Sequence, residues 1–331
     1  MTAWQVHERH DLRALHEVWT AAAATAAEDH IFQRWELAQI WMTVFGRAWD
    51  CRILWRAFPP VVLPLVVDGQ GNWSLLGNGL FDFCDGLGAP DAADVANLRQ
   101  ACDGGQGRRA VAWNQFRVTG LRDDSRFLEL WRALGLRVEP YAGAPRVPAQ
   151  DAAAWILRHP RLSDRFEAAQ RQGWRLERLD DPRARMQLLH RILVWKEGRL
   201  HDLGQDNVLG EREQSWLQHM VARYPELAEL WAWGRGAEWQ AGFLCWNESG
   251  APAASAAVPG WRRGYTLAFA PEAADRSPGS LLLFGVMQHS LVAGRGFDLL
   301  TGEQEFKRRL ATARVGLQCI RGQNGAEQGE C

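Results

Sequence analysis

Hydrophobic and polar positions follow two alternating periods along the chain, and the alternation predicts helices interleaved with strands. Leu12, Leu15 and Trp19 share one face of a helix, whereas the short apolar run at 61–67 is typical of a strand. In the first half, the predicted helices are 11–27, 35–45, 91–102 and 125–134, and the predicted strands are 4–8, 51–58, 61–67, 73–76, 110–116 and 136–140. This order indicates an α/β fold, in which helices cover a sheet.

The second half has the same order of helices followed by consecutive strands, without a repeat in the sequence itself. Its predicted helices are 151–173, 181–199 and 211–224, and its predicted strands are 174–179, 228–235, 238–246, 254–258 and 261–270. The stretch 141–148 is rich in Pro, Gly and Ala, which indicates a linker.

The length favours two lobes over a single core. The 331 residues suit two lobes of roughly 150 residues each. We therefore predict an N-terminal lobe over 1–145, a C-terminal lobe over 146–322 and a flexible tail over 323–331. Each lobe is expected to be a mixed sheet flanked by helices, with a cleft between or beside the lobes.

The charge balance excludes a strong whole-molecule field. Lys and Arg together number 38 and Asp and Glu 39, so nothing in the totals favours DNA or an anionic membrane surface. The N-terminus lacks the apolar core of a signal peptide, and the apolar runs are too short to cross a bilayer. The sequence therefore predicts a cytoplasmic protein without a transmembrane segment.

Cysteine and histidine are scattered, which argues against a metal centre. The six cysteines form no Cys-x-x-Cys motif and have no histidine at metal-ligand spacing, so we expect buried thiols and no metal site. Lysine is informative in a different way, because only Lys196 and Lys307 occur in a chain that otherwise uses arginine. An ammonium group differs chemically from a guanidinium, which makes both positions candidates for function. His190 lies in a stretch that could face a cleft.

The segment 265–310 has the pattern of a strand, a loop, a sharply started helix, a tight turn and a second strand. Ser277 is placed as the N-cap, Pro278 as the first helical residue, and Gly279 allows close approach to the backbone. The free N–H groups at 279–281, which include that of Ser280, predict an anion site.

The strand at 297–300 ends in a charged turn that carries Glu303, Glu305, Lys307 and Arg308. Ligands in α/β proteins gather where strands end and connections diverge, which makes this turn a candidate site. A solvated charged turn remains the alternative, because runs of charge usually face water.

The same segment resembles the C-terminal signature of GNAT-type acyltransferases of the BioF2-like or cellulose-biosynthesis CelD group, relatives of the FemABX transferases. The matching residues are Tyr265, Phe269, Pro271, Ser277-Pro278-Gly279, Leu281–Leu283, Asp298, Gly302, Glu303, Phe306 and Lys307. The departures are Thr301 for the usual Arg, Gln304-Glu305 for Glu-Pro, and Phe306 for Tyr. Fainter matches lie at Leu63-Pro-Leu65, Leu75-Leu-Gly77, Asp82-Phe-Cys-Asp85, Leu189-His190 and Trp195.

The resemblance implies two GNAT-like lobes and transfer of an acyl group from a thioester donor, acyl-CoA or acyl carrier protein, to an amine such as an amino sugar. Glu303 is the first choice of general base and Glu305 the second, with Lys307 as the third catalytic candidate. Donor contacts are expected from Phe269 and the helix start Ser277-Pro278-Gly279-Ser280. The expected substrate-binding residues are Tyr265, Asp298, Arg308, Asp82, Asp85, His190, Trp195 and Lys196.

Three functions remain open. The first is thioester-dependent N-acylation of a small-molecule or glycan-precursor acceptor in envelope or polysaccharide biosynthesis. The second is FemABX-like transfer from aminoacyl-tRNA, for which a stronger basic surface is expected. The third is a non-catalytic relative that binds a partner, favoured by Phe306 and by the missing Arg/Gln-x-x-Gly-x-Gly phosphate loop. Asp82 and Asp85 also fit turn-stabilising aspartates.

Overall fold

The structure is a computed structural model that describes residues 4–25, 31–91, 94–102, 114–207, 209–236, 238–248 and 260–323. It divides into two compact units. Unit 1 comprises residues 1–143 and 315–331, and unit 2 comprises residues 144–314. The C-terminal strand therefore belongs to unit 1, whereas the sequence placed it in the second lobe. The reason is a long-range pairing, because residues 317–323 lie antiparallel to residues 115–122.

Unit 1 contains a mixed sheet with helices. Its strands are β1 (Gln5–His7), β2 (Trp49–Arg56), β3 (Val61–Asp68), β4 (Asn72–Leu75), β5 (Leu87–Gly88), β6 (Gln115–Arg122), the first part of β7 (Arg137–Val147) and most of β13 (Ala313–Gln323). Its helices are α1 (His16–Ala24), α2 (Trp35–Phe45), α3 (Asp94–Cys102) and α4 (Leu128–Ala133). The strand order is β1-β2-β3-β4-β6-β13-β7, with β5 paired to β3. β3 is buried over nearly its whole length, as its apolar run predicts.

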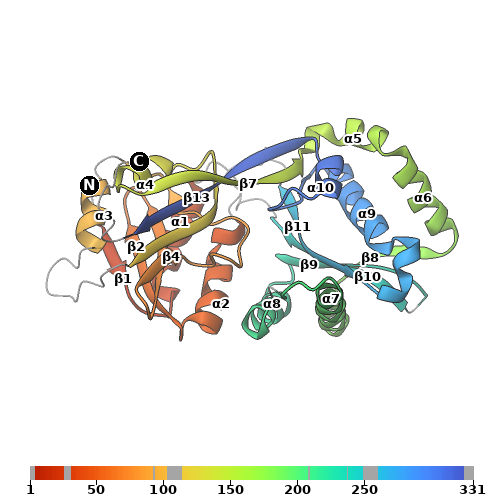
Figure 1. Ribbon diagram of the computed structural model, residues 1–331, viewed down its shortest axis with the longest axis horizontal. Coiled ribbons are helices and arrows are strands. Elements are labelled where there is room, and N and C mark those ends of the chain that lie inside the picture. The colour runs from red at the N-terminus through yellow and green to blue at the C-terminus, as the bar shows by residue number, and fades with distance from the viewer. Residues whose placement is uncertain are drawn as a thin grey trace. The chain divides into compact units, whose positions relative to one another are not determined.

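Unit 2 is a second mixed sheet with helices on both faces (Figure 1). Its elements are α5 (Ala152–Arg158), α6 (Pro160–Arg171), β8 (Trp174–Leu179), α7 (Pro182–Asp202), α8 (Glu211–Arg223), β9 (Ala228–Arg235), β10 (Glu238–Asn247), β11 (Trp261–Phe269), α9 (Pro278–Val292), β12 (Gly296–Asp298) and α10 (Glu305–Leu310). The strand order is β7-β12-β11-β10-β9-β8. α7 and α8 cover one face, and α5, α6 and α9 cover the other.

The core of unit 2 is built around α9 and a group of aromatic rings. Phe166 of α6 stacks on Trp233 with ring centroids 5.0 Å apart, and Trp155 of α5 stacks on Phe284 of α9 at 5.3 Å. Gly285 makes room for Phe166, because a Cβ at this position would lie 2.5 Å from the ring. α9 is buried around almost its whole circumference, as its apolar sequence predicts.

Several predicted elements differ from the structure for identifiable reasons. The predicted helix 151–173 breaks at His159, and Pro160 begins α6, because proline favours the first helical position. The predicted linker 141–148 is instead the end of β7, whose Arg146 and Val147 pair with β12. The predicted strand 254–258 lies outside the described residues. Four cysteines are free and buried as expected, namely Cys51, Cys84, Cys245 and Cys319.

None of the helices in the described ranges has both the length and the apolar character that a membrane span needs.

Candidate functional site

Strands β11 and β12 run side by side for only three residues and then diverge. Trp261–Arg263 pair in parallel with Gly296–Asp298, while β11 continues to Phe269 along β10. On the other side of the divergence, the Leu299 N–H donates to the Pro145 carbonyl at 2.9 Å, so the chain follows β7. β10 pairs with one edge of β11 as far as residue 269. Among the described residues, no strand pairs with the other edge, the one next to β12, from residue 264 onward. From this point on, β11 has no strand partner on that side within the described residues, and β12 runs along β7 instead.

The first turn of α9 packs directly on the end of β11. A Cβ at Gly279 would lie 2.9 Å from Phe269 Cδ1 and 3.0 Å from Leu267 Cδ2, so only glycine allows this approach. Ser277 occupies the N-cap position, but its backbone is left-handed at φ 53° and its side chain makes no capping hydrogen bond. The expected side-chain cap is therefore wrong. Ser280 is exposed at the third position of the helix.

Helix α7 supplies two cations to the same end of β11. The half-buried Lys196 donates from Nζ to Thr266 Oγ1 at 3.2 Å, and Thr266 itself is buried. The Arg199 guanidinium lies over the Phe269 ring, 5.3 Å from its centroid. Arg199 lies about one turn and Lys196 about two turns before the end of α7. Both bring positive charge to the end of β11 that α9 contacts.

A buried group of three charged side chains lies where the pairing of β11 and β12 ends. Arg263 donates from Nη1 to Asp298 Oδ2 at 2.8 Å and from Nη2 to Glu248 Oε2 at 2.9 Å. Arg263 and Asp298 are the last pair of β11 and β12 before the strands separate, and each side chain is 1% exposed. Asp298 is thus far from the solvent that a substrate-binding carboxylate would contact, which contradicts that expected role.

The charged turn after β12 carries exposed, ion-paired carboxylates, in line with the alternative of a solvated turn. Glu303 is 44% exposed and pairs with Arg314 at 2.6 Å. Glu305 is 65% exposed and pairs with Arg309 on α10. A partly apolar cleft would raise the pKa of a carboxyl group that acts as general base, and neither side chain has that environment. Lys307 is half-buried and donates from Nζ to the Thr301 carbonyl at 2.8 Å.

The remaining predicted residues of unit 2 are spread over its surface and its α7–α8 face. The Tyr265 ring lies edge-on to Trp246, with centroids 5.3 Å apart, and is half-buried. Trp195 is half-buried on α7, whereas His190 and Arg308 are exposed. The structure therefore brings Lys196, Phe269 and the start of α9 together, and it leaves His190 and Arg308 as surface residues.

Unit 1 has its own pair of parallel strands, but the chain itself fills the place where they diverge. β4 and β6 pair only over Asn72–Trp73 and Gln115–Phe116. Beyond that point, the side chains of Ser74 and Asn78 and the backbone of Cys84 form hydrogen bonds with β6. These bonds run from Ser74 Oγ to Arg117 O at 2.7 Å, from Thr119 N–H to Asn78 Oδ1 at 2.9 Å, and from Cys84 N–H to Gly120 O at 3.1 Å. The open strand edge is therefore a feature of unit 2.

Asp82 and Asp85 lie in the segment that follows this closure in unit 1. Asp85 is only 6% exposed, and it accepts the Gly86 N–H at 2.7 Å. Burial raises its pKa to about 7 despite hydrogen bonds from Ser125 and Gly86 and the charge of Arg122. Asp85 is thus enclosed within unit 1, which contradicts its expected role in binding a substrate, and Asp82 is half-buried.

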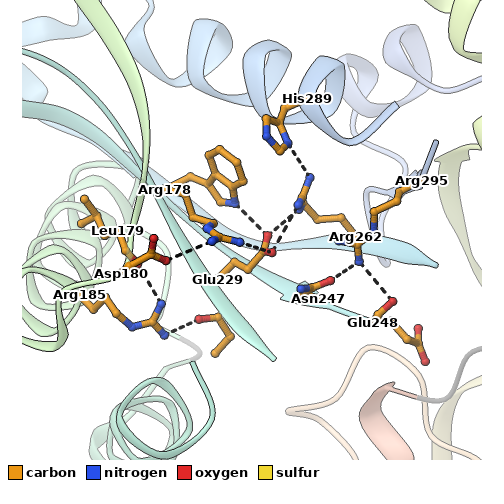
Figure 2. Close-up of polar contacts among 12 residues, drawn as sticks. Arg178, Leu179, Asp180, Arg185, Glu229, Asn247, Glu248, Arg262, His289 and Arg295 are labelled. Carbon is orange, nitrogen blue, oxygen red and sulfur yellow. Dashed lines mark hydrogen bonds and ion pairs between the residues drawn. The ribbon is translucent and has the colours of Figure 1, made fainter. Parts of the chain in front are cut away.

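Sequence reasoning missed a buried charge cluster in unit 2, at the start of β11, where Arg262 lies next to Arg263 (Figure 2). Glu229 accepts from Arg262 at 2.7 Å and from Trp231 Nε1 at 3.1 Å, and Arg178 lies 3.6 Å away. Burial alone would raise the pKa of Glu229, but Arg262 and the bond from Trp231 hold that pKa below its ordinary value. Burial and Arg262 lower the pKa of His289. Two adjacent arginines inside a predicted strand were the available signal.

No group of three or more His, Cys, Asp or Glu side chains suited to a metal occurs within the described part of the chain.

Comparison with known proteins assigns a domain family to most of unit 2. Residues 160–308 match the model of the acetyltransferase (GNAT) domain family, a range that begins with α6 and ends within α10. It includes the divergent strands and α9. A search of curated protein sequences gave no match. Unit 2 thus contains a GNAT acyltransferase-like domain.

Three solved structures share the fold over almost the whole chain. FemX is 11% identical, with 96% of each chain covered and a TM-score of 0.61. L-PGS from Bacillus licheniformis is 12% identical, with 97% of this chain and 94% of that chain covered and a TM-score of 0.60. A conserved protein of unknown function from Bacteroides thetaiotaomicron is 8% identical, with 96% and 99% covered and a TM-score of 0.63.

At these identities the structural similarity concerns the fold alone. The expected α/β fold with two GNAT-like lobes is confirmed, as is the structural similarity to FemX. Membership of the BioF2-like or CelD group stays a prediction.

Proposed function

We propose that this chain is a cytoplasmic N-acyltransferase that moves an acyl group from a thioester, acyl-CoA or an acylated carrier protein, to an amine acceptor. The observation that supports the proposal most is the open edge of β11 beside the first turn of α9. A GNAT domain match over 160–308 includes both elements. The acceptor proposed is an amino sugar or another glycan precursor, as in the BioF2-like and CelD group.

The donor is proposed to lie along the open edge of β11. Backbone N–H groups of residues 266–269 would donate to the thioester carbonyl, and a fixed donor of this kind stabilises the oxyanion that develops during acyl transfer. The N–H groups of the first α9 turn and Arg199 favour a phosphate-bearing donor end. Binding both substrates in line supplies much of the rate enhancement, and it needs no covalent enzyme intermediate.

The acceptor is proposed to approach from the α7 face of β11. Lys196 lies on that face, and its ammonium group favours an acceptor that carries a carboxylate or a phosphate. The half-buried Tyr265 and Trp195 provide aromatic surface of the kind that sugars and other flat rings contact. The amine must lose a proton as the new amide bond forms. The resemblance to the BioF2-like group keeps Glu303 as the proposed base, although its side chain is exposed and paired with Arg314.

The first test concerns the donor. We expect Ser280→Asp to weaken binding of acyl-CoA at least about tenfold, because a carboxylate on the first α9 turn repels the donor phosphates. The same change should leave the protein equally or slightly more stable, since a negative charge favours a helix N-terminus. Isothermal titration with acetyl-CoA and longer acyl-CoAs measures the affinity. Ser280→Asn is the neutral control, and equal affinity of the two variants would contradict this donor position.

The second test concerns the base. We expect Glu303→Gln to lower kcat about 100-fold or more with unchanged donor affinity, because only proton removal is lost. The matched control is Glu167→Gln, an exposed carboxylate on α6 that also pairs with an arginine, Arg171, at 3.8 Å. Full turnover by Glu303→Gln would remove Glu303 from the mechanism. Donor binding without turnover in the unaltered protein would favour a non-catalytic binding relative.

One observation favours aminoacyl-tRNA as an alternative donor. Five exposed arginines lie on α5, α6 and the start of β8, namely Arg158, Arg161, Arg165, Arg171 and Arg175. Clustered arginines bind phosphate backbones, and such binding weakens steeply with salt. Thermal-shift measurements with acyl-CoA, acylated carrier protein and charged tRNA at two salt concentrations separate the donors. Stabilisation by tRNA alone would replace the thioester proposal with a FemABX-like one.

A further inference from the structure

The backbone is left-handed at two non-glycine residues within the described part of the chain, and both flank the divergence of β11 and β12. Ser277, at φ 53°, precedes α9, and Leu300, at φ 59°, follows β12. A left-handed conformation costs a residue such as leucine roughly 1–2 kcal/mol. Such residues persist only where their surroundings hold them, and they gather at functional sites. Leu300 therefore needs a physical explanation.

Asp298 supplies that explanation. Its Oδ1 accepts the Leu300 N–H at 2.7 Å, and its Oδ2 accepts Arg263 Nη1 at 2.8 Å. Arg263 is fixed in turn by Glu248, at 2.9 Å. Because Arg263 and Asp298 are 1% exposed, water competes little for these bonds, and a charge-assisted bond in such surroundings is strong. The carboxylate thus connects the last pair of β11 and β12 to the left-handed residue.

The left-handed turn at Leu300 sets the direction that the chain takes once β12 has separated from β11. Before it, Leu299 already follows β7 through its bond to Pro145. After it, the chain reaches Thr301, whose carbonyl accepts the Lys307 ammonium. If residue 300 adopted the ordinary extended conformation, the chain after Leu299 would take another direction beside the open edge of β11. The turn and the open edge are therefore parts of one arrangement.

We infer that Asp298 is a positioning residue for donor binding, which acts by holding Leu300 in the left-handed conformation that keeps the edge of β11 open. Arg263 and Glu248 orient Asp298 for this role. Asp298 does not itself contact the substrate, because its two oxygens already have partners and its side chain is enclosed. The inference rests on the proposed function, since the open edge is where the thioester donor is proposed to lie.

The test compares Asp298→Ala with the same change in a Leu300→Gly background. We expect Asp298→Ala to raise the KM for acyl-CoA about tenfold and to leave kcat within about threefold. A tenfold change corresponds to the free-energy cost of one left-handed non-glycine residue. Glycine adopts positive φ without a steric penalty, so it removes the need for the Asp298 bond. In the Leu300→Gly background, Asp298→Ala should therefore change KM by less than about threefold.

A matched control separates positioning from general destabilisation. Glu229→Ala removes a carboxylate that is similarly buried and also bonded to an arginine of β11, namely Arg262, the residue that precedes Arg263. It should lower stability without changing the donor KM. A similar rise in KM in both variants, or an equally large effect of Asp298→Ala in both backgrounds, would overturn the inference.

Hydrogen–deuterium exchange provides a readout that does not depend on turnover. Asp298→Ala should speed exchange of the backbone N–H groups at 299–303 and leave exchange in β9 unchanged. Glu229→Ala should speed exchange in β9 and leave exchange at 299–303 unchanged. Unchanged exchange at 299–303 would refute the role of Asp298. If the unaltered protein bound no thioester, the proposed function would fail, and the exchange data would still decide whether Asp298 holds the turn.

Discussion

Replacing Arg185 with methionine is expected to lower the free energy of unfolding by about 3–5 kcal/mol. The Arg185 side chain is 3% exposed, and its guanidinium donates to three backbone carbonyls. These are Leu179 at 3.1 Å, Val221 at 3.2 Å and Ala228 at 2.6 Å. Arg185 thereby joins α7 to the end of β8, to α8 and to β9, and Figure 2 shows its contact with Leu179. Methionine has a similar reach but no donors, so these bonds are lost in a buried place.

Urea unfolding followed by far-UV circular dichroism measures the effect. Arg183→Met is the matched control, because Arg183 is exposed two residues earlier on the same helix, and surface changes usually stay within about 0.5 kcal/mol. Arg185→Lys should recover only part of the loss, since one ammonium cannot reach carbonyls on three elements as a planar guanidinium does. Equal unfolding midpoints for Arg185→Met and Arg183→Met would show that Arg185 does not stabilise unit 2.

Elements with local start signals were predictable from the sequence. The predicted helix at 181–199 corresponds to α7, because Asp181 accepts the Ala184 N–H at 2.7 Å and proline follows it. The start of α9 was predictable for the same reason, although Ser277 does not cap it with its side chain. A proline also ends a helix, and His159-Pro160 divided the long helix predicted at the start of the second lobe.

Long-range pairings decided the features that local patterns could not predict. The run 141–148 is rich in proline and glycine, which indicates a linker locally, yet its last residues form strand pairs with β12. The C-terminal strand pairs with residues about 200 positions earlier along the chain, so it belongs to unit 1. Neither pairing leaves a periodic signal in its own sequence window, because the partner determines it.

The candidate site was predictable in part. The sequence analysis expected donor contacts from both Phe269 and the start of α9, and in the structure Gly279 packs against Phe269. It also singled out Lys196 of α7, whose ammonium group bonds Thr266 of β11. The ion pair of Glu303 and the buried triad around Arg263 could not be predicted, because both depend on side chains from distant elements. Charge within a strand was the signal that the sequence reasoning passed over.

Replacing Asp85 with asparagine is expected to stabilise unit 1 at alkaline pH by up to about 4 kcal/mol relative to its effect at pH 4. Burial raises the pKa of Asp85 from 3.8 to about 7 in the folded protein. The charged form therefore has to exist inside the protein above pH 7, where it is poorly solvated. Asparagine keeps an oxygen that can accept the Gly86 N–H, and it never carries the charge.

The direction of the pH dependence follows from proton binding. Between the two pKa values, the folded protein holds a proton on Asp85 that the unfolded chain has lost. The stability that Asp85 contributes is therefore complete below about pH 4 and declines as the pH rises through 7. The difference in free energy of unfolding between Asp85→Asn and the unaltered protein should grow across this range, while contributions from other titrating groups cancel in the difference.

Urea unfolding at intervals from pH 4 to pH 8 tests this dependence. Asp50→Asn is the control for the chemical change itself, because Asp50 is exposed on β2 of the same unit. Asp85→Ala should show the same pH dependence but lower stability at every pH, since it also loses the bond to Gly86. A difference for Asp85→Asn that does not change between pH 4 and 8 would mean that Asp85 titrates as an ordinary carboxyl. Burial would then be insufficient to hold its proton, and the segment after Asp82 would have to admit water.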